Sequence, residues 1–393
     1  MRVRETVMVR HYLTLAALVT LLLGSVTAVA GPTFYGFVKL DASLDSAMTD
    51  NGDYAYLVLP YADGQEDDEF NMTANQSRIG VTLDGPDGDG VDVSGKIEFD
   101  FYGGGAENKP NPRLRHAYLT LEFAGIDVLA GQTSDVVSPL YPTTINFIVL
   151  RKSGNIGYRR PQIRLTKTVE MMDGAQLTLA ASANRSMGRG YDGEDAGVPS
   201  FQGRAAFATK LSGGKVAELG VSGLWGREES TYADSVGATT TYELDATGFA
   251  VDVSVPLGER VALKGEYFSG KNLTTYVGGI GQGIAEIRRD DAVDDEPPDE
   301  VSEIEATGWW GQVTVRPAER LEFNVGAGSD DPELPEGDTV NDIERNTTYY
   351  GNVIWTVAPS TTVGAEYAKF ETEYTGDKTY ENARMQLSLT YKF

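Results

Sequence analysis

The chain has 393 residues, carries a formal net charge of −25 at pH 7 and contains no cysteine. The lack of cysteine excludes disulfide bonds and cysteine-based metal or nucleophile chemistry. The acidic balance argues against nucleic acid as a partner, because phosphate contacts need clustered Lys and Arg. We therefore expect no nucleic-acid partner, no metal and no cofactor.

The first thirty residues have the three parts of a secretory signal peptide. A basic stretch precedes the apolar run LTLAALVTLLLGSV, and Ala28-Val29-Ala30 forms a small-residue cleavage site before Gly31. The alternative, a membrane-anchoring helix, needs an apolar run of about 20 residues, and this run is shorter. We predict that residues 1–30 are removed and that the mature chain, 31–393, is exported.

After residue 32, apolar and polar residues alternate in runs of about 9 to 12 residues, each followed by a turn or a loop. A two-residue period is typical of β-strands, whose successive side chains point to opposite faces. We count sixteen such runs, good to about two either way. They start with TFYGFVKLDA, SRIGVTLDG and VDVSGKIEFDFYG, and they finish with TTVGAEYAKFE and ENARMQLSLTYKF.

The connections between the runs alternate in length. Short ones such as Ala124–Gly125 and Ser212–Gly214 are followed by long ones such as Thr133–Ser153 and Lys271–Glu305. Short turns at one end and long loops at the other are typical of an up-and-down transmembrane β-barrel. The sequence predicts an all-β, antiparallel barrel of about sixteen strands, located in the outer membrane of a Gram-negative-type bacterium.

The two faces of each run fit this fold. Ile97 and Phe99 share one face, and Lys96 and Glu98 share the other. The apolar face would contact lipid and the polar face a water-filled lumen. Because only a closed barrel satisfies the backbone of every strand in a bilayer, the last run should pair with the first.

The third long loop, Thr133–Ser153, is less acidic than the other long loops and rich in apolar residues. We predict that it folds into the lumen and narrows the path, with a subunit contact or a surface plug as the alternatives. The residues expected in this constriction loop are Ser134, Asp135, Ser138, Tyr141, Thr143, Thr144 and Asn146.

Basic residues recur on the predicted lumen face, mostly in the first half of the barrel. They are Arg78, Lys96, Arg160, Arg164, Arg204, Lys210 and Arg384. A basic wall opposite Asp135 would set up a field across the path and attract small anions. The alternative is that these residues pair with lumen acids such as Glu98, Glu218 or Glu366 and only keep the lumen hydrated.

Most of the negative charge lies in three acidic segments of the long loops, between Asp45 and Glu69, around RRDDAVDDEPPDEVSEIE and around DDPELPEGDTVNDIE. We assign it to the outer mouth, where it would aid solubility or contact lipopolysaccharide through divalent ions. DGPDGDG lacks the downstream Glu of an EF-hand loop and is interpreted as a turn. GGIGQG has no βαβ context and is interpreted as a loop.

Catalysis has little support in the sequence. His116 is the only histidine after the predicted cleavage site, and neither G-x-S-x-G nor H-E-x-x-H occurs. A membrane-embedded hydrolase using His116 and a closed structural or surface-binding barrel are the alternatives to a channel.

The C-terminal strand ends on Tyr391 and Phe393, which resembles the signal that the barrel assembly machinery recognises. With the alternating loops and the stretch IDVLAGQTSDVVSPLYPTTINF, it makes the chain similar to the DcaP-like outer-membrane porins. That resemblance implies sixteen-stranded homotrimers that pass small anionic or aromatic acids; the coiled coil of some members is not expected here. We predict passive diffusion of small hydrophilic solutes, favouring small anions such as carboxylates, and no enzymatic activity.

Overall fold

The computed structural model describes residues 31–393 except 63, 86–89, 107–108, 173, 188–195, 212, 234–236, 289–296, 339–341 and 377. The predicted signal peptide lies outside the described residues, so its cleavage stays a prediction. Among the residues described, no helix is long and apolar enough to cross a membrane.

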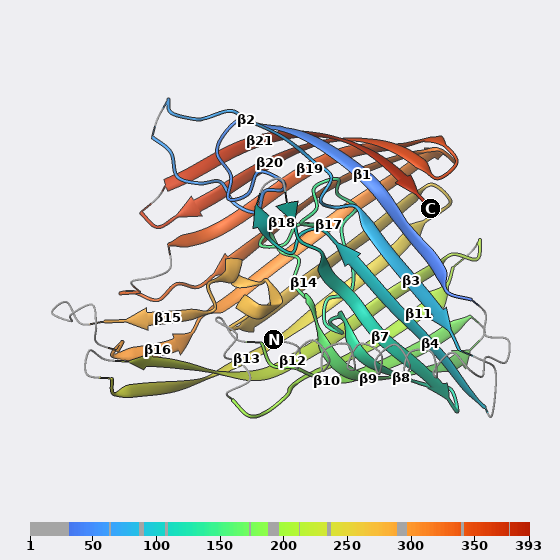
Figure 1. Ribbon diagram of the computed structural model, residues 1–393, viewed down its shortest axis with the longest axis horizontal. Coiled ribbons are helices and arrows are strands. Elements are labelled where there is room, and N and C mark those ends of the chain that lie inside the picture. Colours follow the sequence, from blue (N-terminus) through green and yellow to red (C-terminus); the bar gives the residue numbers. More distant parts are fainter. Residues whose placement is uncertain are drawn as a thin grey trace, which may run out of the picture.

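One large antiparallel sheet forms the body of the molecule (Figure 1). Its strands are β1 (Thr33–Asp45), β2 (Glu69–Thr73), β3 (Arg78–Asp84), β4 (Val91–Asp100), β7 (Arg113–Phe123), β8 (Ile126–Ser134), β9 (Arg159–Met172), β10 (Ala175–Asn184), β11 (Ser200–Lys210), β12 (Val216–Ala233), β13 (Thr239–Leu257), β14 (Val261–Lys271), β17 (Glu305–Ala318), β18 (Leu321–Pro332), β19 (Ile343–Ala358), β20 (Thr361–Tyr374) and β21 (Lys378–Lys392). Because β2 and β3 pair with successive stretches of β1, they share one position, and the sheet closes as a barrel of sixteen strands.

The loops carry a few smaller elements. They are the two-stranded sheets β5 (Gly105–Ala106) with β6 (Lys109–Pro110) and β15 (Ile284–Ile287) with β16 (Glu300–Glu303), and the short 3₁₀ helices η1 (Thr274–Tyr276) and η2 (Gly279–Gly281). The β15–β16 hairpin projects from the barrel near the extended ends of β12 and β13 (Figure 1).

The first and last strands close the barrel. The ladder between β1 and β21 runs from the pair Phe37–Lys392 to the pair Asp45–Arg384. Phe393 continues it, because it exchanges two backbone hydrogen bonds with Gly36, at 3.0 and 3.1 Å. The predicted fold class is therefore confirmed. Boundaries differ from the alternating runs at some strands. The run NIGYRRPQIRLTKTV predicts a start at Asn155, whereas β9 begins at Arg159, and the run KVAELGVSGLWG predicts an end at Gly226, whereas β12 continues to Ala233.

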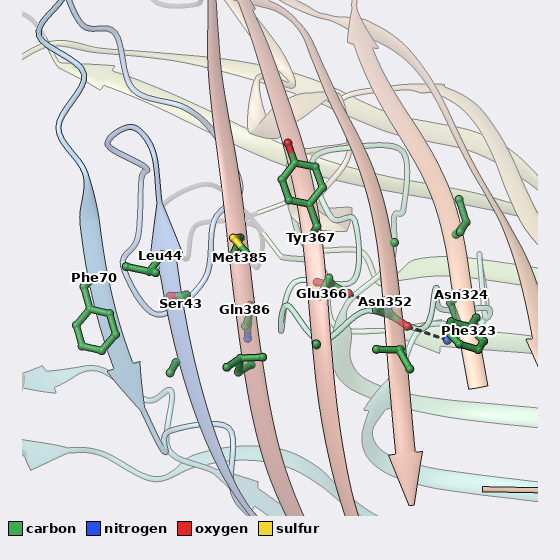
Figure 2. Close-up of a pocket in the computed structure, with 16 residues that line it drawn as sticks. Ser43, Leu44, Phe70, Phe323, Asn324, Asn352, Glu366, Tyr367, Met385 and Gln386 are labelled. Carbon is green, nitrogen blue, oxygen red and sulfur yellow. Dashed lines mark hydrogen bonds between the residues drawn. The ribbon is translucent and has the colours of Figure 1, made fainter. Parts of the chain in front are cut away.

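Side chains alternate across the wall as the two-residue period predicts. On β20, Tyr367 is 53% exposed on the outer face, whereas its neighbour Glu366 is 6% exposed and faces inward. Met385 and Gln386 repeat this contrast on β21, and both pairs can be followed in Figure 2. The hollow of about 610 Å³ that Figure 2 shows, edged by exposed residues such as Phe70 and Tyr367, lies on this apolar outer face and is not a solute path.

Three loops fill one side of the barrel interior. They are residues 46–68 after β1, 135–158 after β8, and the segment after β14 that carries η1 and η2. Their buried apolar residues pack in three clusters against strands between β12 and β20. Val137 and Ile156 of the second loop lie with Tyr276 of η1, and Leu150 lies with Val58 of the first loop. A cavity remains open on the side of the interior that is bounded by β3, β4, β7, β8 and β9.

Candidate functional site

The loop of residues 135–158, which we call the constriction loop, crosses the interior and is fastened to the wall by carboxylates. Glu266 of β14 accepts hydrogen bonds from the Ser138 hydroxyl at 2.6 Å and the Leu140 amide at 2.7 Å. Glu366 of β20 accepts the amides of Ile145 and Asn146 at 2.6 and 3.0 Å. Charge-assisted bonds of this kind are stronger than neutral ones, so acids of the lumen wall hold this loop in place.

The same loop receives cations and amides from the wall. Lys264 donates to the Tyr141 carbonyl at 2.7 Å and Lys39 to the Ile145 carbonyl at 3.0 Å. Asn346 donates to the Lys152 carbonyl at 2.7 Å, and burial lowers the pKa of the Lys152 ammonium below its ordinary value. Contacts therefore extend from Ser138 to Lys152, and the loop lies inside the barrel over most of its length.

The open space between this loop and the β3–β9 wall is a cavity of about 300 Å³, which we call the arginine cavity. Among the described residues, its lining contains no Asp or Glu but five arginines and one histidine: Arg78, Arg113, Arg115, Arg151, Arg159 and His116. Aromatic residues complete it, namely Tyr56, Tyr141, Phe147 and Tyr158.

A β-bulge delivers part of this charge. Between β4 and β7 the register runs from Glu98–His116 to Phe99–Leu114, so Arg115 is an extra residue on β7. A bulge re-aims side chains, and here it brings Arg115 and His116, neighbours in sequence, to the same cavity. Counted by strict alternation from Leu119 and Leu121, Arg113 and Arg115 would fall on the lipid face, so the two-residue period alone does not identify them as lumen residues.

Behind the lining, two buried acids compensate some of the arginines. Asp100 accepts two bonds from Arg113, at 2.9 and 2.7 Å, and one from Arg115 at 2.7 Å. Glu98 accepts one from Arg115 at 2.8 Å and lies 3.7 Å from Arg78. In these ion pairs, carboxylates of the wall balance most of the positive charge of Arg113 and Arg115.

Arg151 and Arg159 have no carboxylate partner among the described residues. Both guanidinium groups lie over the ring of Tyr158, at 5.4 and 4.7 Å from its centroid. Nη1 of Arg151 is buried without a hydrogen-bond partner. Since an uncompensated buried charge is costly, an anion bound in the cavity would stabilise this pair.

Backbone strain presents Arg151 to the cavity. Val149, Leu150 and Lys152 have φ of 51°, 60° and 59°, a conformation that is uncommon for bulky side chains and rare for a β-branched one. Asn155 holds the turn by donating to the Val149 carbonyl at 2.6 Å. Strain of this kind persists only where surrounding contacts enforce it, and it is concentrated at functional sites.

The predicted constriction-loop residues are divided between the cavity and the wall. Ser134 and Tyr141 line the arginine cavity. Ser138, Thr143 and Asn146 bond to the barrel wall through Glu266, Gln312 and Glu366, and the Thr144 hydroxyl donates to the Asn146 carbonyl. Asp135 does not face an open path, because Arg160 binds it at 2.7 and 3.0 Å and both side chains are 1% exposed.

The predicted basic wall is likewise divided. Only Arg78 lines the arginine cavity. Arg160 is covered by Asp135 and by the Tyr276 ring at 4.0 Å, and Arg384 is paired with Asp45 at 3.0 Å in a buried site. Arg204 is paired with Asp252 and Glu218, and Lys96 lies 3.5 Å from Glu98. Arg164 donates to the Ser134 carbonyl, and Lys210 lies exposed at the end of β11.

For most of this set the structure therefore shows the alternative that the sequence left open, pairing within the wall. The expected field between Asp135 and an opposing basic wall is replaced by a direct Asp135–Arg160 ion pair. Among the described residues, the cations that line the cavity without a carboxylate partner are Arg151, within the constriction loop, and Arg159, which directly follows it. The sequence signal that could have identified these two arginines is their position in or next to a loop expected in the lumen.

His116 lies in the wrong setting for a hydrolase. Its Nδ1 is 3.0 Å from the hydroxyl of Thr133, which is a buried residue, and its Nε2 is 3.8 Å from Glu98, beyond hydrogen-bonding distance. Glu98 is itself bound by Arg115 and Tyr35. These groups form an ion-pair network and not the chain of nucleophile, base and orienting acid that a triad requires.

Two of the glycine-rich sequence motifs lie in connections between strands. DGPDGDG lies partly outside the described residues, and its second residue, Gly85, donates its amide to the Val93 carbonyl at 2.7 Å, as in a turn. GGIGQG forms η2, where Asp330 accepts the amides of Gly279 and Ile280. Both observations agree with a turn and a loop.

Comparison with known proteins decides the family. A model of the Gram-negative porin family matches residues 14–375. The chain belongs to the Gram-negative porin family. It is therefore an outer-membrane channel, and both family and fold indicate a channel rather than an enzyme. A search of curated proteins gives no match.

Solved structures show which porins share the fold. The outer-membrane channel DcaP of Acinetobacter baumannii is 22% identical, with 94% of this chain and 99% of that chain covered and a TM-score of 0.71. OmpT of Vibrio cholerae in a trimer form is 14% identical, with coverage of 92% and 99% and a TM-score of 0.54. An anion-selective porin from Comamonas acidovorans is 11% identical, with coverage of 92% and 99% and a TM-score of 0.56. The resemblance to DcaP-like porins is thus confirmed.

Proposed function

We propose that this porin passes small anions such as carboxylates in preference to cations, by passive diffusion between the constriction loop and the β3–β9 wall. The observation that carries the proposal is the lining of the arginine cavity, which in the described part of the chain has five arginines and no carboxylate. Rings of Arg or Lys at a narrow point favour anions in pores.

The acidic outer loops do not oppose this proposal. Asp45 and Asp330 of the acidic segments are buried. The exposed acids, such as Glu66, Asp67 and Asp68, would lie at a wide and water-filled mouth, where salt screens them beyond about 8 Å at physiological ionic strength. In the cavity, less water separates a permeating ion from the guanidinium groups, so the same charge produces a larger interaction. The narrow region therefore sets the selectivity.

One structural neighbour adds limited support. The Comamonas acidovorans porin is described as anion-selective, and at 11% identity it shares the fold alone with this chain. It supports the proposal only as an example that this barrel accommodates an anion-selective path.

We also propose a homotrimer, by analogy with the trimer form of OmpT. The barrel assembly machinery would recognise Tyr391 and Phe393. The acidic loops would contact lipopolysaccharide. The mass of the detergent-solubilised protein tests the trimer, and a monomer mass under non-denaturing conditions would contradict it.

Selectivity is tested by reconstituting the purified protein in a planar bilayer under a KCl gradient. We expect stepwise channel openings and a reversal potential displaced toward the chloride equilibrium potential, because the cavity cations attract chloride. A reversal potential displaced toward the potassium equilibrium potential would contradict the proposal.

A further inference from the structure

Glu98 of β4 occupies the centre of the basic side of the lumen. The residue is 4% exposed, and five proton donors surround its carboxylate: Tyr35, Arg78, Lys96, Arg115 and His116. A pore that only needed positive charge would not require an acid here. The charge of Glu98 reduces the attraction that the arginine cavity exerts on anions.

The contacts of Glu98 fall into two classes. Arg115 and Tyr35 bind it at 2.8 and 2.9 Å. Lys96, Arg78 and His116 lie further away, at 3.5, 3.7 and 3.8 Å. The first class anchors the carboxylate, and the second is only loosely attached to it.

The loosely attached cations are also the more accessible ones. The side chains of Lys96 and Arg78 are 27% and 24% exposed, compared with 9% for Arg115. In addition, Nε of Arg78 is buried without a hydrogen-bond partner. That atom is not itself accessible, so a second carboxylate would meet the exposed part of the Arg78 guanidinium, which lines the arginine cavity.

We propose that Glu98 is a tethered carboxylate that competes with permeating carboxylates for Arg78, the loosely attached arginine that lines the arginine cavity. A solute carboxylate in the cavity binds Arg78 in place of Glu98, and Arg78 returns to Glu98 as the solute leaves. Conduction requires binding that is favourable enough for entry and weak enough for exit, and a built-in competitor lowers solute affinity without removing the cations. This inference rests on the proposed anion path and adds a residue that sets how tightly the path holds its solute.

The test uses propionate, the free counterpart of a Glu side chain, as a blocker of chloride current through single channels. Replacing Glu98 with Gln removes the competing charge, and we expect the half-blocking concentration of propionate to fall about tenfold, as expected for gaining one charge-assisted hydrogen bond. Glu122→Gln, which removes one acid at the short-turn end of β7, is the matched control and should keep the wild-type value.

Glu98→Asp separates contact from charge. It keeps the negative charge beside Arg115 but shortens the side chain by one methylene, which withdraws it from Arg78 and Lys96. We expect the wild-type reversal potential with tighter propionate block. Loss of the heat-resistant band on gels would show that Glu98→Gln does not fold. In that case the propionate block of Glu98→Asp still tests the proposal.

Two outcomes would overturn the proposal. One is an unchanged half-blocking concentration of propionate in folded Glu98 variants. The other is tighter propionate block in Glu98→Gln with no tightening in Glu98→Asp, which would assign the effect to net charge. The proposed anion path fails separately, if the wild-type channel itself prefers cations.

Discussion

A porin in which Arg151 and Arg159 are both replaced by glutamine is expected to lose most of its preference for anions. These two guanidinium groups share the Tyr158 ring and have no carboxylate partner in the described part of the chain. The other cavity arginines have acids near them, Asp100 or Glu98. The uncompensated pair should therefore supply most of the field that a permeating ion meets.

The measurement is the reversal potential in a KCl gradient. We expect the chloride-to-potassium permeability ratio to fall by about tenfold, or roughly 1.4 kcal/mol. A matched control replaces Lys167 and Lys215, which donate to turn carbonyls at the short-turn end, and should keep the wild-type ratio. An unchanged ratio in the Arg151/Arg159 double variant would show that the other cavity cations or the mouth charges decide selectivity.

Exchange of residues 139–152 for a short glycine-serine linker is expected to raise single-channel conductance by about twofold or more, because barrels of sixteen strands enclose an aqueous channel when nothing fills them. This segment carries the apolar contacts of Leu150 and the bonds to Glu266 and Glu366 that hold the loop across the interior.

A control for this variant shortens the β12–β13 hairpin. Trp225 is the last residue of β12 that pairs with β11. Beyond it, within the described residues, β12 pairs with β13 alone, and the two strands continue as a hairpin to Ala233 and Thr239. Removing residues 231–241 should leave the conductance near the wild-type value. Equal conductances for the wild type and the 139–152 variant would show that the loop does not limit the path.

The barrel could be predicted from the sequence because each strand carries its own signal. In a two-residue period, the neighbours of a residue such as Glu366 or Tyr367 are enough to assign it to a face. The alternation of short turns and long loops shows which strand ends lie together at each end of the barrel. Closure followed from the requirement that all backbone groups be paired in lipid. The observed ladder from Phe37–Lys392 to Asp45–Arg384 is the result of that requirement.

The cavity could not be predicted by the same reasoning, because a single inserted residue reverses parity. The bulge at Arg115 turns Arg113 and Arg115 from the outer face to the lumen, and no composition signal marks it. Arg151 depends on left-handed backbone at Val149 and Leu150, which is set by contacts distant in sequence.

Pairing is the other feature that the sequence did not reveal. Parity places Arg160 inside the barrel, and the predicted inward fold of the loop places Asp135 there. Neither says whether the two side chains face each other across water or touch. Because desolvation makes an isolated buried charge costly, the two charges pair directly beneath the constriction loop. The same physical reason explains the Arg384–Asp45 and Arg204–Asp252 pairs.

The central claim is that solutes pass through the arginine cavity, and the cysteine-free sequence permits a direct measurement. A single cysteine at Ser134, which lines the cavity, is treated with a sulfonate-bearing methanethiosulfonate while the current through open channels is recorded. Ser222, buried on β12 beneath the constriction loop, is the control position. The account predicts that modification at position 134 removes about half or more of the conductance, that the anionic reagent reacts about tenfold faster than its trimethylammonium counterpart, and that the cysteine at position 222 does not respond. Full modification at position 134, verified by mass, with unchanged conductance would contradict it.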